Sequence, residues 1–569
     1  MSLIKKTEGY IKNIVNDLGY EIDNVSLEEC NFKEFGQFQL NICMGLAKQA
    51  HKNPREVAGE IVEKLDDRFT NVNIQGPGFI NLSFSDEYLI NYFNEYGFED
   101  AVDKENPKTI VIDFGGANAA KTLHVGHMRS ANIGEALRRL LVLFGNNVIS
   151  DVHLGDMGRQ AGMLISQLQI ENPDLPYFDP NFKGEYPKLN ITASDLGRMY
   201  PLASTLAKEN PERMEEVRRI TSEIEKGNEV YISLWKQMVD VSIPEIKKVY
   251  NQLNCHFDLF EGELDSLKLV DNVTKIIEPY LYESEGARVI DVAKEDDKKE
   301  MPPLIYIKND GATLYATREL ATIHSRIERF NPNEIWYIVD DRQSLYFEQV
   351  FRASQKIGLT PNTDLFHYGF GTINGSDGKP YKTRDGGVME LSSLIELIRN
   401  EIASKVKSEI TENREEIIDK LTIATIKYTD LLPFRKTDYV FDPVKFSSLD
   451  GKTGPYILYT VVRIKSILNK VEDSNKISVI NNDEMRDLLV KLISLPKALT
   501  SSYKEATLSY ICEYLYEICS LFNKFYNSCN IINEQDENVK NSYIAFINKV
   551  YNVINGLLNV LAIDEVEKM

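Results

Sequence analysis

The stretch VIDFGGANAAKTLHVGHMRSANIGEALRRLL, from Val111 to Leu141, decides which fold this sequence predicts. Its first residues are apolar, as in a buried strand, and a glycine-rich loop follows them. Apolar side chains then recur at helical spacing from about residue 126 to residue 144, and Gly145 stands where a helix commonly ends. A strand, a glycine-rich loop and a helix in this order begin a nucleotide-binding βα unit.

One interpretation of the loop is a phosphate-binding loop of the P-loop type. Gly115, Lys121 and Thr122 match that signature, but Ala120 replaces its last glycine. The aspartates that end the apolar run 335–341 would supply the acidic partner of such a loop. Because an L-residue is strained at the positive φ that this loop uses, Ala120 argues against the interpretation.

A second interpretation starts from His124 and His127, which lie three residues apart at the beginning of the predicted helix and therefore share one face. With Gly126 between them, a base or ribose could approach the backbone closely. Both imidazoles would then reach the phosphates of a nucleotide at the positive end of the helix dipole. A histidine pair that only caps the helix fits the same four residues, so the spacing alone leaves both possibilities open.

The composition limits the classes of protein that the chain can represent. A length of 569 residues predicts about three or four domains. A net charge of -21 argues against nonspecific binding to DNA or another polyanion, although 441–470 carries five basic side chains against two aspartates. We expect a cytoplasmic protein without a membrane partner, since no apolar run approaches the roughly 18 residues of a membrane span. Six scattered cysteines without C-x-x-C spacing predict neither a zinc site nor a disulfide framework, and we expect no bound metal.

Changes of pattern along the chain predict three domains. We expect a small α+β domain over 1–105 and an α/β catalytic domain over 106–405, built on a Rossmann-type parallel sheet. A mostly helical insertion of about 165–300 interrupts the second domain. Successive amphipathic segments over 406–569 predict an all-α bundle.

Individual elements follow from the same patterns. Strands are predicted at 148–154, 304–307 and 335–341, all in one parallel sheet that the insertion splits. Helices are predicted at Thr7–Leu18, Leu40–Ala50 and Thr317–Phe330.

In this context the sequence resembles the class I aminoacyl-tRNA synthetases, whose first signature is His-x-Gly-His, and among them the arginyl-tRNA synthetases. The resemblance covers nearly the whole chain, and its motifs occur in the family's order: GPGFIN (76–81), the opening stretch, LYATREL (314–320), YIVDDRQ (337–343), GKPYKTRDGG (378–387), RKTDYVFD (435–442) and GKTGPYILYTVVR (451–463). It implies ATP-dependent attachment of L-arginine to tRNA(Arg) through an arginyl-adenylate, which releases AMP and pyrophosphate.

The resemblance also implies the partners. ATP enters as a substrate with Mg²⁺, no cofactor is tightly bound, and the enzyme is a monomer. The N-terminal domain contacts the tRNA elbow, and the helical bundle binds the anticodon. We expect Tyr456, Tyr459 and Arg463 on the anticodon face of the bundle, although core aromatics with an arginine that reaches the surface fit these residues equally well.

The resemblance implies that His124, Gly126 and His127 bind ATP. The second signature normally supplies a lysine that holds the pyrophosphate, but here PYKTR replaces the usual string, with Pro380 and Thr383 at its lysine positions. Lys121 then substitutes for the missing lysine. The second-signature residues implied in ATP binding or catalysis are Lys379, Lys382, Thr383 and Arg384.

A guanidinium substrate requires planar recognition by carboxylates. The resemblance implies that Glu263 and Glu319 supply them, that Tyr315 and Gln343 line the pocket, and that Asn118 holds the backbone end of the arginine. Tyr315 and Glu319 are four residues apart at the start of a predicted helix and therefore share a face.

Three departures from the family pattern leave alternatives open. Gly116-Ala117-Asn118 replaces Ser-Pro-Asn, Glu319 replaces aspartate, and Met157 replaces tryptophan. The alternatives are a specialised or non-catalytic paralogue and a free-standing nucleotidyltransferase that uses the two histidines. The second of these has no need of the bundle or of the two glutamates.

Overall fold

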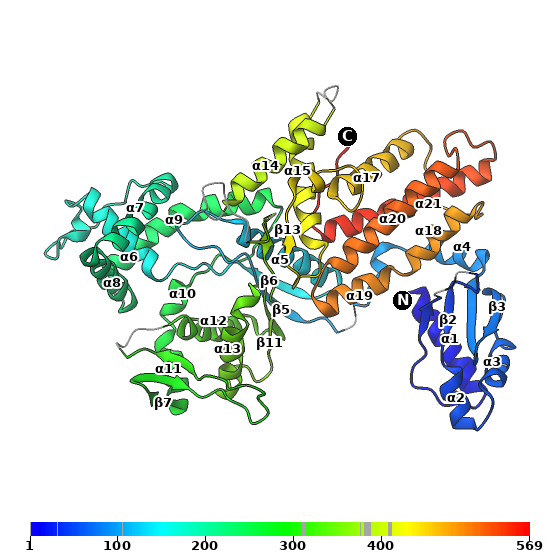
Figure 1. The fold of residues 1–569 in the computed structure, drawn as a ribbon, viewed down its shortest axis with the longest axis horizontal. Helices are drawn as coiled ribbons and strands as arrows, with labels where there is room; N and C mark the ends of the chain where they lie inside the picture. The colour runs from blue at the N-terminus through cyan, green and yellow to red at the C-terminus, as the bar shows by residue number, and fades with distance from the viewer. Residues whose placement is uncertain are drawn as a thin grey trace.

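The computed structural model describes residues 2–30, 32, 34–104, 106–309, 314–375, 377–379, 389–407 and 412–569. The molecule is elongated, with a parallel sheet near its middle, a helical insertion at one end, and a small N-terminal unit beside a helical bundle at the other (Figure 1). None of the helices within the described ranges has the length and apolarity needed to cross a bilayer.

The N-terminal unit is an antiparallel sheet with helices, in which the strands have the order β1-β2-β4-β3. Its elements are α1 (Leu3–Asp17), β1 (Leu27–Glu29), β2 (Phe38–Leu40), α2 (Cys43–Ala50), α3 (Pro54–Val62), β3 (Phe69–Gln75), β4 (Phe79–Phe84), α4 (Asp86–Glu95) and the 3₁₀ turn η1 (Phe98–Ala101). The helix predicted from Leu40 begins three residues later, because 38–40 pair with β1 and β4. Asp86 binds Arg486 of the bundle at 2.9 Å, which joins this unit to the C-terminal part of the chain.

The opening stretch forms the predicted βα unit. Its strand β5 (Thr109–Asp113) lies inside a parallel sheet of order β11-β10-β5-β6, and its helix is α5 (Val125–Leu143). A Cβ placed on Gly134 of α5 would lie 2.1 Å from the side chain of Phe114, so the missing side chain lets the helix approach the end of β5. The other elements are β6 (Asn147–Asp151), α12 (Tyr315–Phe330), β10 (Glu334–Tyr337), η4 (Asp341–Gln343), α13 (Ser344–Lys356) and β11 (Asp364–His367).

The prediction that 304–307 belongs to the parallel sheet is wrong. These residues form β9, which pairs antiparallel with β8 in a separate three-stranded sheet. Its side chains alternate between buried and exposed, and Ile305 is 46% exposed, whereas a strand of a parallel sheet is buried on both faces. The insertion therefore contains strands as well as helices: α6 (Arg159–Glu171), η2 (Pro176–Phe178), α7 (Ala193–Glu209), α8 (Pro211–Glu225), α9 (Glu229–Gln252), α10 (Glu263–Leu267), α11 (Val270–Ile277), η3 (Glu278–Tyr280), β7 (Leu281–Ser284), β8 (Ala287–Ile290) and β9 (Leu304–Ile307).

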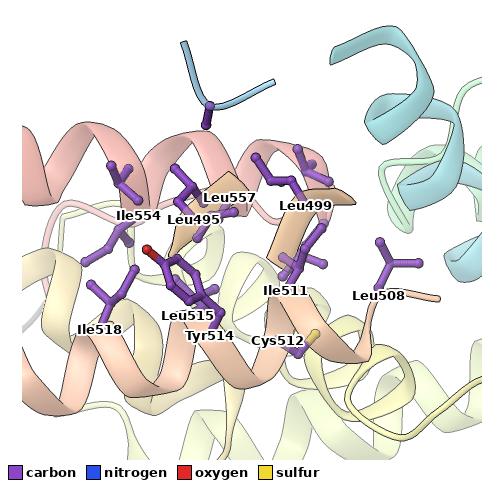
Figure 2. Packing of buried hydrophobic residues seen from close by; sticks show 14 of the residues in the cluster. Leu495, Leu499, Leu508, Ile511, Cys512, Tyr514, Leu515, Ile518, Ile554 and Leu557 are labelled. Atoms are coloured by element: carbon purple, nitrogen blue, oxygen red, sulfur yellow. The ribbon is translucent and has the colours of Figure 1, made fainter. Parts of the chain in front are cut away.

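The C-terminal part is helical, as predicted, and packs directly on α5. Helices α14, α15, α19 and α21 all contact α5. The helix that follows the glycine-rich loop therefore packs both on the parallel sheet and on the C-terminal helices. Apolar side chains from α19, α20 and α21 fill the interior of the bundle (Figure 2). The elements are β12 (Ile373–Asn374), α14 (Leu391–Lys405), α15 (Arg414–Leu431), β13 (Tyr439–Val440), α16 (Pro443–Phe446), α17 (Gly454–Leu468), α18 (Asp483–Ile493), α19 (Leu495–Glu505), α20 (Ser509–Ser528) and α21 (Glu537–Val560).

Candidate active site

The two histidines cap α5 and stack on each other. His124 is the N-cap residue, and its Nδ1 accepts a hydrogen bond from the backbone N–H of Gly126 at 3.1 Å. The Nδ1 of His127 accepts from the backbone N–H of His124 at 3.0 Å, and the ring centroids lie 3.8 Å apart. A Cβ on Gly126 would lie 2.9 Å from the ring of His124, so the glycine makes room for this ring. The capping role that the spacing left open is therefore present.

Capping also determines which nitrogen of each histidine carries a proton. Because both Nδ1 atoms accept hydrogen bonds, the neutral rings carry their proton on Nε2. Burial, followed by the charges of His124 and Lys121, lowers the pKa of His127 to about 3. Burial also lowers the pKa of His124. At neutral pH the pair is therefore two uncharged N–H donors at the positive end of a helix, an arrangement that suits an anionic ligand.

Lys121 lies on the insertion side of the loop. Its Nζ is 4.8 Å from the centroid of the Tyr200 ring on α7, and the residue lines a cavity of about 540 Å³ between the loop, α7 and α9. Ala120 has a φ of +57°, so it adopts the left-handed conformation that we expected it to avoid. Its identity is thus a weaker argument against a P-loop than we inferred. The start of α5 is the stronger argument, because the helix begins four residues after Lys121 instead of beside it.

The second signature is only partly described. Lys382, Thr383 and Arg384 lie outside the described residues, and Lys379 is exposed in a turn where its backbone N–H donates to Asp377. The chain after the signature is held against the first one. The backbone N–H of Leu391 donates to the carbonyl of Leu123, and that of Val125 donates to the carbonyl of Met389. The chain that directly follows the second signature therefore lies at the N-terminus of α5.

The two glutamates expected to bind a guanidinium lie in different surroundings. Glu319, on the same face of α12 as Tyr315, has a buried Oε1 without a hydrogen-bond partner among the described residues. Glu263 is buried at the start of α10 and already holds a guanidinium, because Nε of Arg318 donates to its Oε2 at 2.7 Å. The guanidinium of Arg318 lies 5.0 Å from the ring centroid of Tyr315, which is 59% exposed. The sequence did not predict this internal pairing of Glu263.

A second guanidinium lies deeper, at the carboxyl ends of two sheet strands. Nη2 of Arg326 donates to Asp113 at 2.6 Å and to Asp151 at 2.7 Å. Together with His153 the two aspartates have the spacing of a metal site, but their charges are already paired with Arg326. Burial acts against a charged His153, but Asp113 raises its pKa above the ordinary value. Burial raises the pKa of Asp113 itself.

Asn118 and Gln343, the other residues expected in the pocket, differ in how firmly the fold holds them. The chain around Asn118 pairs with Gly155, where the N–H of Ala119 donates to the Gly155 carbonyl at 3.1 Å. A Cβ on Gly155 would lie 2.5 Å from Oδ1 of Asn118, so this loop pair requires glycine. Gln343 is exposed in η4, the turn that follows β10.

Of the three bundle residues expected to bind the anticodon, Tyr459 is exposed, whereas Tyr456 and Arg463 are half-buried and Tyr456 packs against the core. Tyr459 is 38% exposed, and the guanidinium of Arg463 lies between the rings of Tyr459 and Tyr526 at 4.8 and 4.7 Å from their centroids. Nη1 of Arg463 donates to Asn523, which in turn donates to the hydroxyl of Tyr456. The positive charge counted along 441–470 is partly neutralised, because Lys452 pairs with Glu513 and Lys465 with Glu565.

The sequence did not predict several residues that contact the candidate sites. Asp151, His153 and Asp156 lie in DVHLGD, whose position directly after a predicted strand was a usable signal. Arg318 and Arg326 had no such signal, since a helical arginine is usually exposed. Tyr200, Tyr516 and Tyr526 lie on other helices than the residues that they contact, so no local pattern could assign them.

Comparison with known proteins gives matches along almost the whole chain. Three family descriptions match: "Arginyl tRNA synthetase N terminal domain" over 5–84, "tRNA synthetases class I (R), catalytic domain" over 95–443, and "DALR anticodon binding domain" over 457–569. The chain is 42% identical over 584 residues to the arginine–tRNA ligase of Alkaliphilus oremlandii, covering 100% of both. It is 39% identical over 578 residues to that of Francisella tularensis subsp. holarctica, covering 98% of both.

Solved structures show the same fold. The arginyl-tRNA synthetase of Plasmodium falciparum superposes with a TM-score of 0.79 at 22% identity, covering 100% of this chain and 99% of that one. The Thermus thermophilus arginyl-tRNA synthetase gives a TM-score of 0.79 at 18% identity and covers 100% of both chains. The predicted class I parallel sheet, N-terminal domain and helical C-terminal domain are confirmed.

Proposed function

Given that the chain belongs to the class I arginyl-tRNA synthetases, we propose how its own residues divide the work among the three substrates. The activity itself follows from the family: ATP-dependent attachment of L-arginine to tRNA through an arginyl-adenylate. In the first step the arginine carboxylate attacks the α-phosphorus of ATP, and the bond to pyrophosphate breaks. The arginyl group then passes to the terminal ribose of tRNA(Arg), and AMP leaves.

His124 and His127 bind ATP through their Nε2–H groups. Little proton transfer is needed in the first step, so positioned donors that stabilise charge on the phosphates dominate the catalysis. Two neutral donors above the first turn of α5, with Gly126 between them, support this role. Neutral rings also avoid the cost of burying two like charges side by side while ATP is absent.

Lys121 moves from Tyr200 to the phosphates when ATP binds. A cation on an aromatic face at a partly exposed site is held by roughly 0.5–1 kcal/mol, so a triphosphate can displace it easily. Lys121 thereby takes the role of the second-signature lysine that Thr383 replaces. Lys379, Lys382, Thr383 and Arg384 are proposed to contact ATP from the second signature, with Mg²⁺ entering as the partner of the triphosphate.

The arginine pocket is selective because it holds more carboxylates than cations. Among the described residues, four buried or half-buried carboxylates, Asp113, Asp151, Glu263 and Glu319, lie beside three basic side chains, Arg318, Arg326 and His153. The unpartnered Oε1 of Glu319 is the single observation that carries this proposal, since a buried carboxylate oxygen without a donor is costly until a ligand satisfies it.

The substrate guanidinium binds Glu319 and replaces Arg318 on Glu263. Glu263 is then paired both before and after arginine binds, which avoids an isolated buried charge. Asn118 holds the backbone end of the arginine, and Tyr315 and Gln343 line the mouth of the pocket. Glu319 in place of aspartate shifts the guanidinium by about one methylene length, and displaced Arg318 leaves room for that shift.

The remaining proposals concern tRNA and the state of the enzyme. Tyr456, Tyr459 and Arg463 bind anticodon bases by stacking and charge, a role that is supported by the exposed ring of Tyr459 and by the guanidinium of Arg463 beside it. We propose domains over 1–105, 106–405 and 406–569, of which the first contacts the tRNA elbow. The enzyme acts as a monomer in the cytoplasm and uses no tightly bound cofactor.

The test is arginine-dependent exchange of pyrophosphate into ATP, measured with and without tRNA(Arg). Exchange and aminoacylation with arginine are expected, and the family resemblance implies that exchange requires tRNA. A protein that binds arginine and tRNA but catalyses neither reaction would be a non-catalytic paralogue. Exchange with arginine without any transfer to tRNA would instead indicate a nucleotidyltransferase.

A further inference from the structure

A buried carboxylate lies where α5 meets the first helix of the bundle. Asp430, on α15, is 1% exposed. Its Oδ2 accepts a hydrogen bond from Asn132 at 3.0 Å, its Oδ1 accepts one from the hydroxyl of Tyr439 at 3.0 Å, and Nε of Arg129 lies 3.4 Å from that Oδ1. We name these four residues the Asp430 cluster. None of them belongs to the sites assigned above.

The cluster holds the helix that carries His127. Arg129 and Asn132 lie two and five residues further along α5, and a helix moves as a rigid rod over such a distance. Nη1 of Arg129 also donates to the carbonyl of Thr437 at 3.0 Å. Contacts with 430–439, a segment at the start of the bundle, therefore help to hold the helix of the first signature in position.

The same segment holds the approach to the second signature. Tyr439 lies on β13, which pairs in parallel with β12, with Tyr439 opposite Ile373. The backbone N–H of Thr372 donates to Asp438 at 2.6 Å, and that of Phe441 donates to the carbonyl of Asn374 at 2.9 Å. Since β12 ends four residues before the second signature begins, both α5 and the chain that leads to the second signature contact one short segment, 430–441.

The cluster is also connected to the anticodon face. Helix α17, which carries Tyr459 and Arg463, packs on α15. A Cβ on Gly454 would lie 2.3 Å from the carbonyl oxygen of Ala424, so the backbones of the two helices are in contact there. Ala424 lies six residues before Asp430 on the same helix, so a displacement of α17 reaches the cluster through a rigid element.

A buried ion pair with several hydrogen bonds is an expensive way to hold two helices together. Apolar side chains of similar volume often give equal or greater stability, so a buried polar cluster is better explained by a need for one defined arrangement. Here the arrangement includes the helix that begins at the two histidines and the short strand β12.

We propose that Asp430, Arg129, Asn132 and Tyr439 are positioning residues that make the rate of arginine activation depend on the tRNA bound to the bundle. The proposal rests on the proposed roles of the histidines and the anticodon face. Binding of tRNA shifts α17 and α15, and the cluster passes this shift along α5 to His127. The cluster therefore changes the turnover of activation and leaves the affinities for ATP and arginine unchanged.

The test compares two conservative variants of tyrosines in the same region. Tyr439→Phe removes the hydrogen bond to Asp430. Tyr428→Phe, on α15 two residues before Asp430, removes a buried hydrogen bond to the carbonyl of Cys512 on α20, 2.9 Å away. Pyrophosphate exchange is measured with tRNA(Arg) and with a transcript whose anticodon bases are replaced, and thermal unfolding is followed for both variants.

Tyr439→Phe is expected to lower the kcat of exchange about tenfold, the scale of a lost hydrogen bond to a charged group, with Michaelis constants for ATP and arginine within about twofold. It should also narrow the difference in kcat between the two transcripts. Tyr428→Phe should lose similar thermal stability and keep its kcat within about twofold of wild type.

Equal losses of kcat in both variants would show that the cluster is only structural and would overturn the proposal. An unchanged difference between the two transcripts in Tyr439→Phe would overturn it as well. Either result is distinguishable from failure of the proposed function, in which the wild-type enzyme itself shows no exchange.

Discussion

The proposed arginine pocket and the proposed phosphate site differ in the charge of the side chains that line them. Around the proposed pocket, Asp113, Asp151 and Glu263 are buried and paired with guanidiniums of the chain itself. At the start of α5 the two histidines are neutral, and the nearest lysine rests on an aromatic ring outside the site.

The difference follows from what each ligand carries. We propose that the substrate guanidinium, a single planar cation, is recognised by carboxylates in defined positions. Arginines of the chain itself pair with these carboxylates until the substrate binds. A triphosphate carries several charges and leaves as pyrophosphate within one turnover. Neutral donors with a mobile lysine can bind it without leaving a buried positive cluster when it departs.

The largest predicted effect tests the fixed charge of the arginine pocket. Glu319→Gln should weaken arginine binding by about a hundredfold or more, the scale for losing one partner of a buried charge pair. The Michaelis constant for ATP should stay unchanged. Titration calorimetry with arginine measures the affinity, and Glu328→Gln on the same helix, where the side chain is 64% exposed, is the matched control.

Glu263→Gln adds a comparison inside the pocket. It should weaken arginine binding less than Glu319→Gln does. In the wild-type enzyme the substrate must displace Arg318 from Glu263, so part of the energy of its contact with Glu263 is already spent on that displacement. Equal arginine affinity in wild type and in both variants would remove the two glutamates from the pocket.

The second prediction tests the mobile charge of the phosphate site. Lys121→Ala should lower kcat by roughly 10- to 100-fold, as expected when one stabilising contact to the transition state is lost, with arginine affinity unchanged. Lys248→Ala removes a lysine that lines the same cavity from α9 and should have little effect. Steady-state kinetics of pyrophosphate exchange would contradict the proposal if the two variants behaved alike.

The third prediction concerns the bundle, far from both sites. Alanine at Tyr456, Tyr459 and Arg463 together should raise the Michaelis constant for tRNA about tenfold or more, since stacked bases are lost. Tyr510→Ala, at an exposed tyrosine in the first turn of α20, serves as the control in aminoacylation assays. An unchanged constant in the triple variant would leave these residues with a structural role.

The last prediction is that one group, His127, does not titrate near neutral pH. His127 should keep its neutral Nε2–H tautomer from pH 8 to pH 5, because its pKa is lowered to about 3. Nitrogen-15 shifts of the histidine rings measure this directly, with exposed His51 as the reference in the same spectrum. If His127 instead took up a proton with a midpoint near pH 6.5, the phosphate site would not be neutral, and its contrast with the charged arginine pocket would be lost.

The same shift of pKa predicts a change in stability with a definite sign. The unfolded chain takes up a proton at His127 near pH 6.5, whereas the folded chain does so near pH 3. Between these values the unfolded state binds more protons, so this residue makes folding less favourable as the pH falls from about 6.5 to 3.

The sequence by itself determined the elements whose signals are local. The strand, loop and helix of 109–143, the helical bundle and the positions of both histidines follow from periodicity, glycine placement and spacing, because backbone geometry imposes those patterns on neighbouring residues. The resemblance to the synthetases added the family and its substrates, and the comparisons confirm both.

Only the tertiary structure decided which charges meet. Three contacts join segments far apart in the chain: Glu263 with Arg318, Lys121 with Tyr200, and Asn132 with Asp430 in the Asp430 cluster. The same holds for 304–307, where an apolar run predicted a strand but could not specify its sheet. A local pattern sets the conformation of a segment, whereas its partners depend on where the whole chain brings a second segment within a few ångströms.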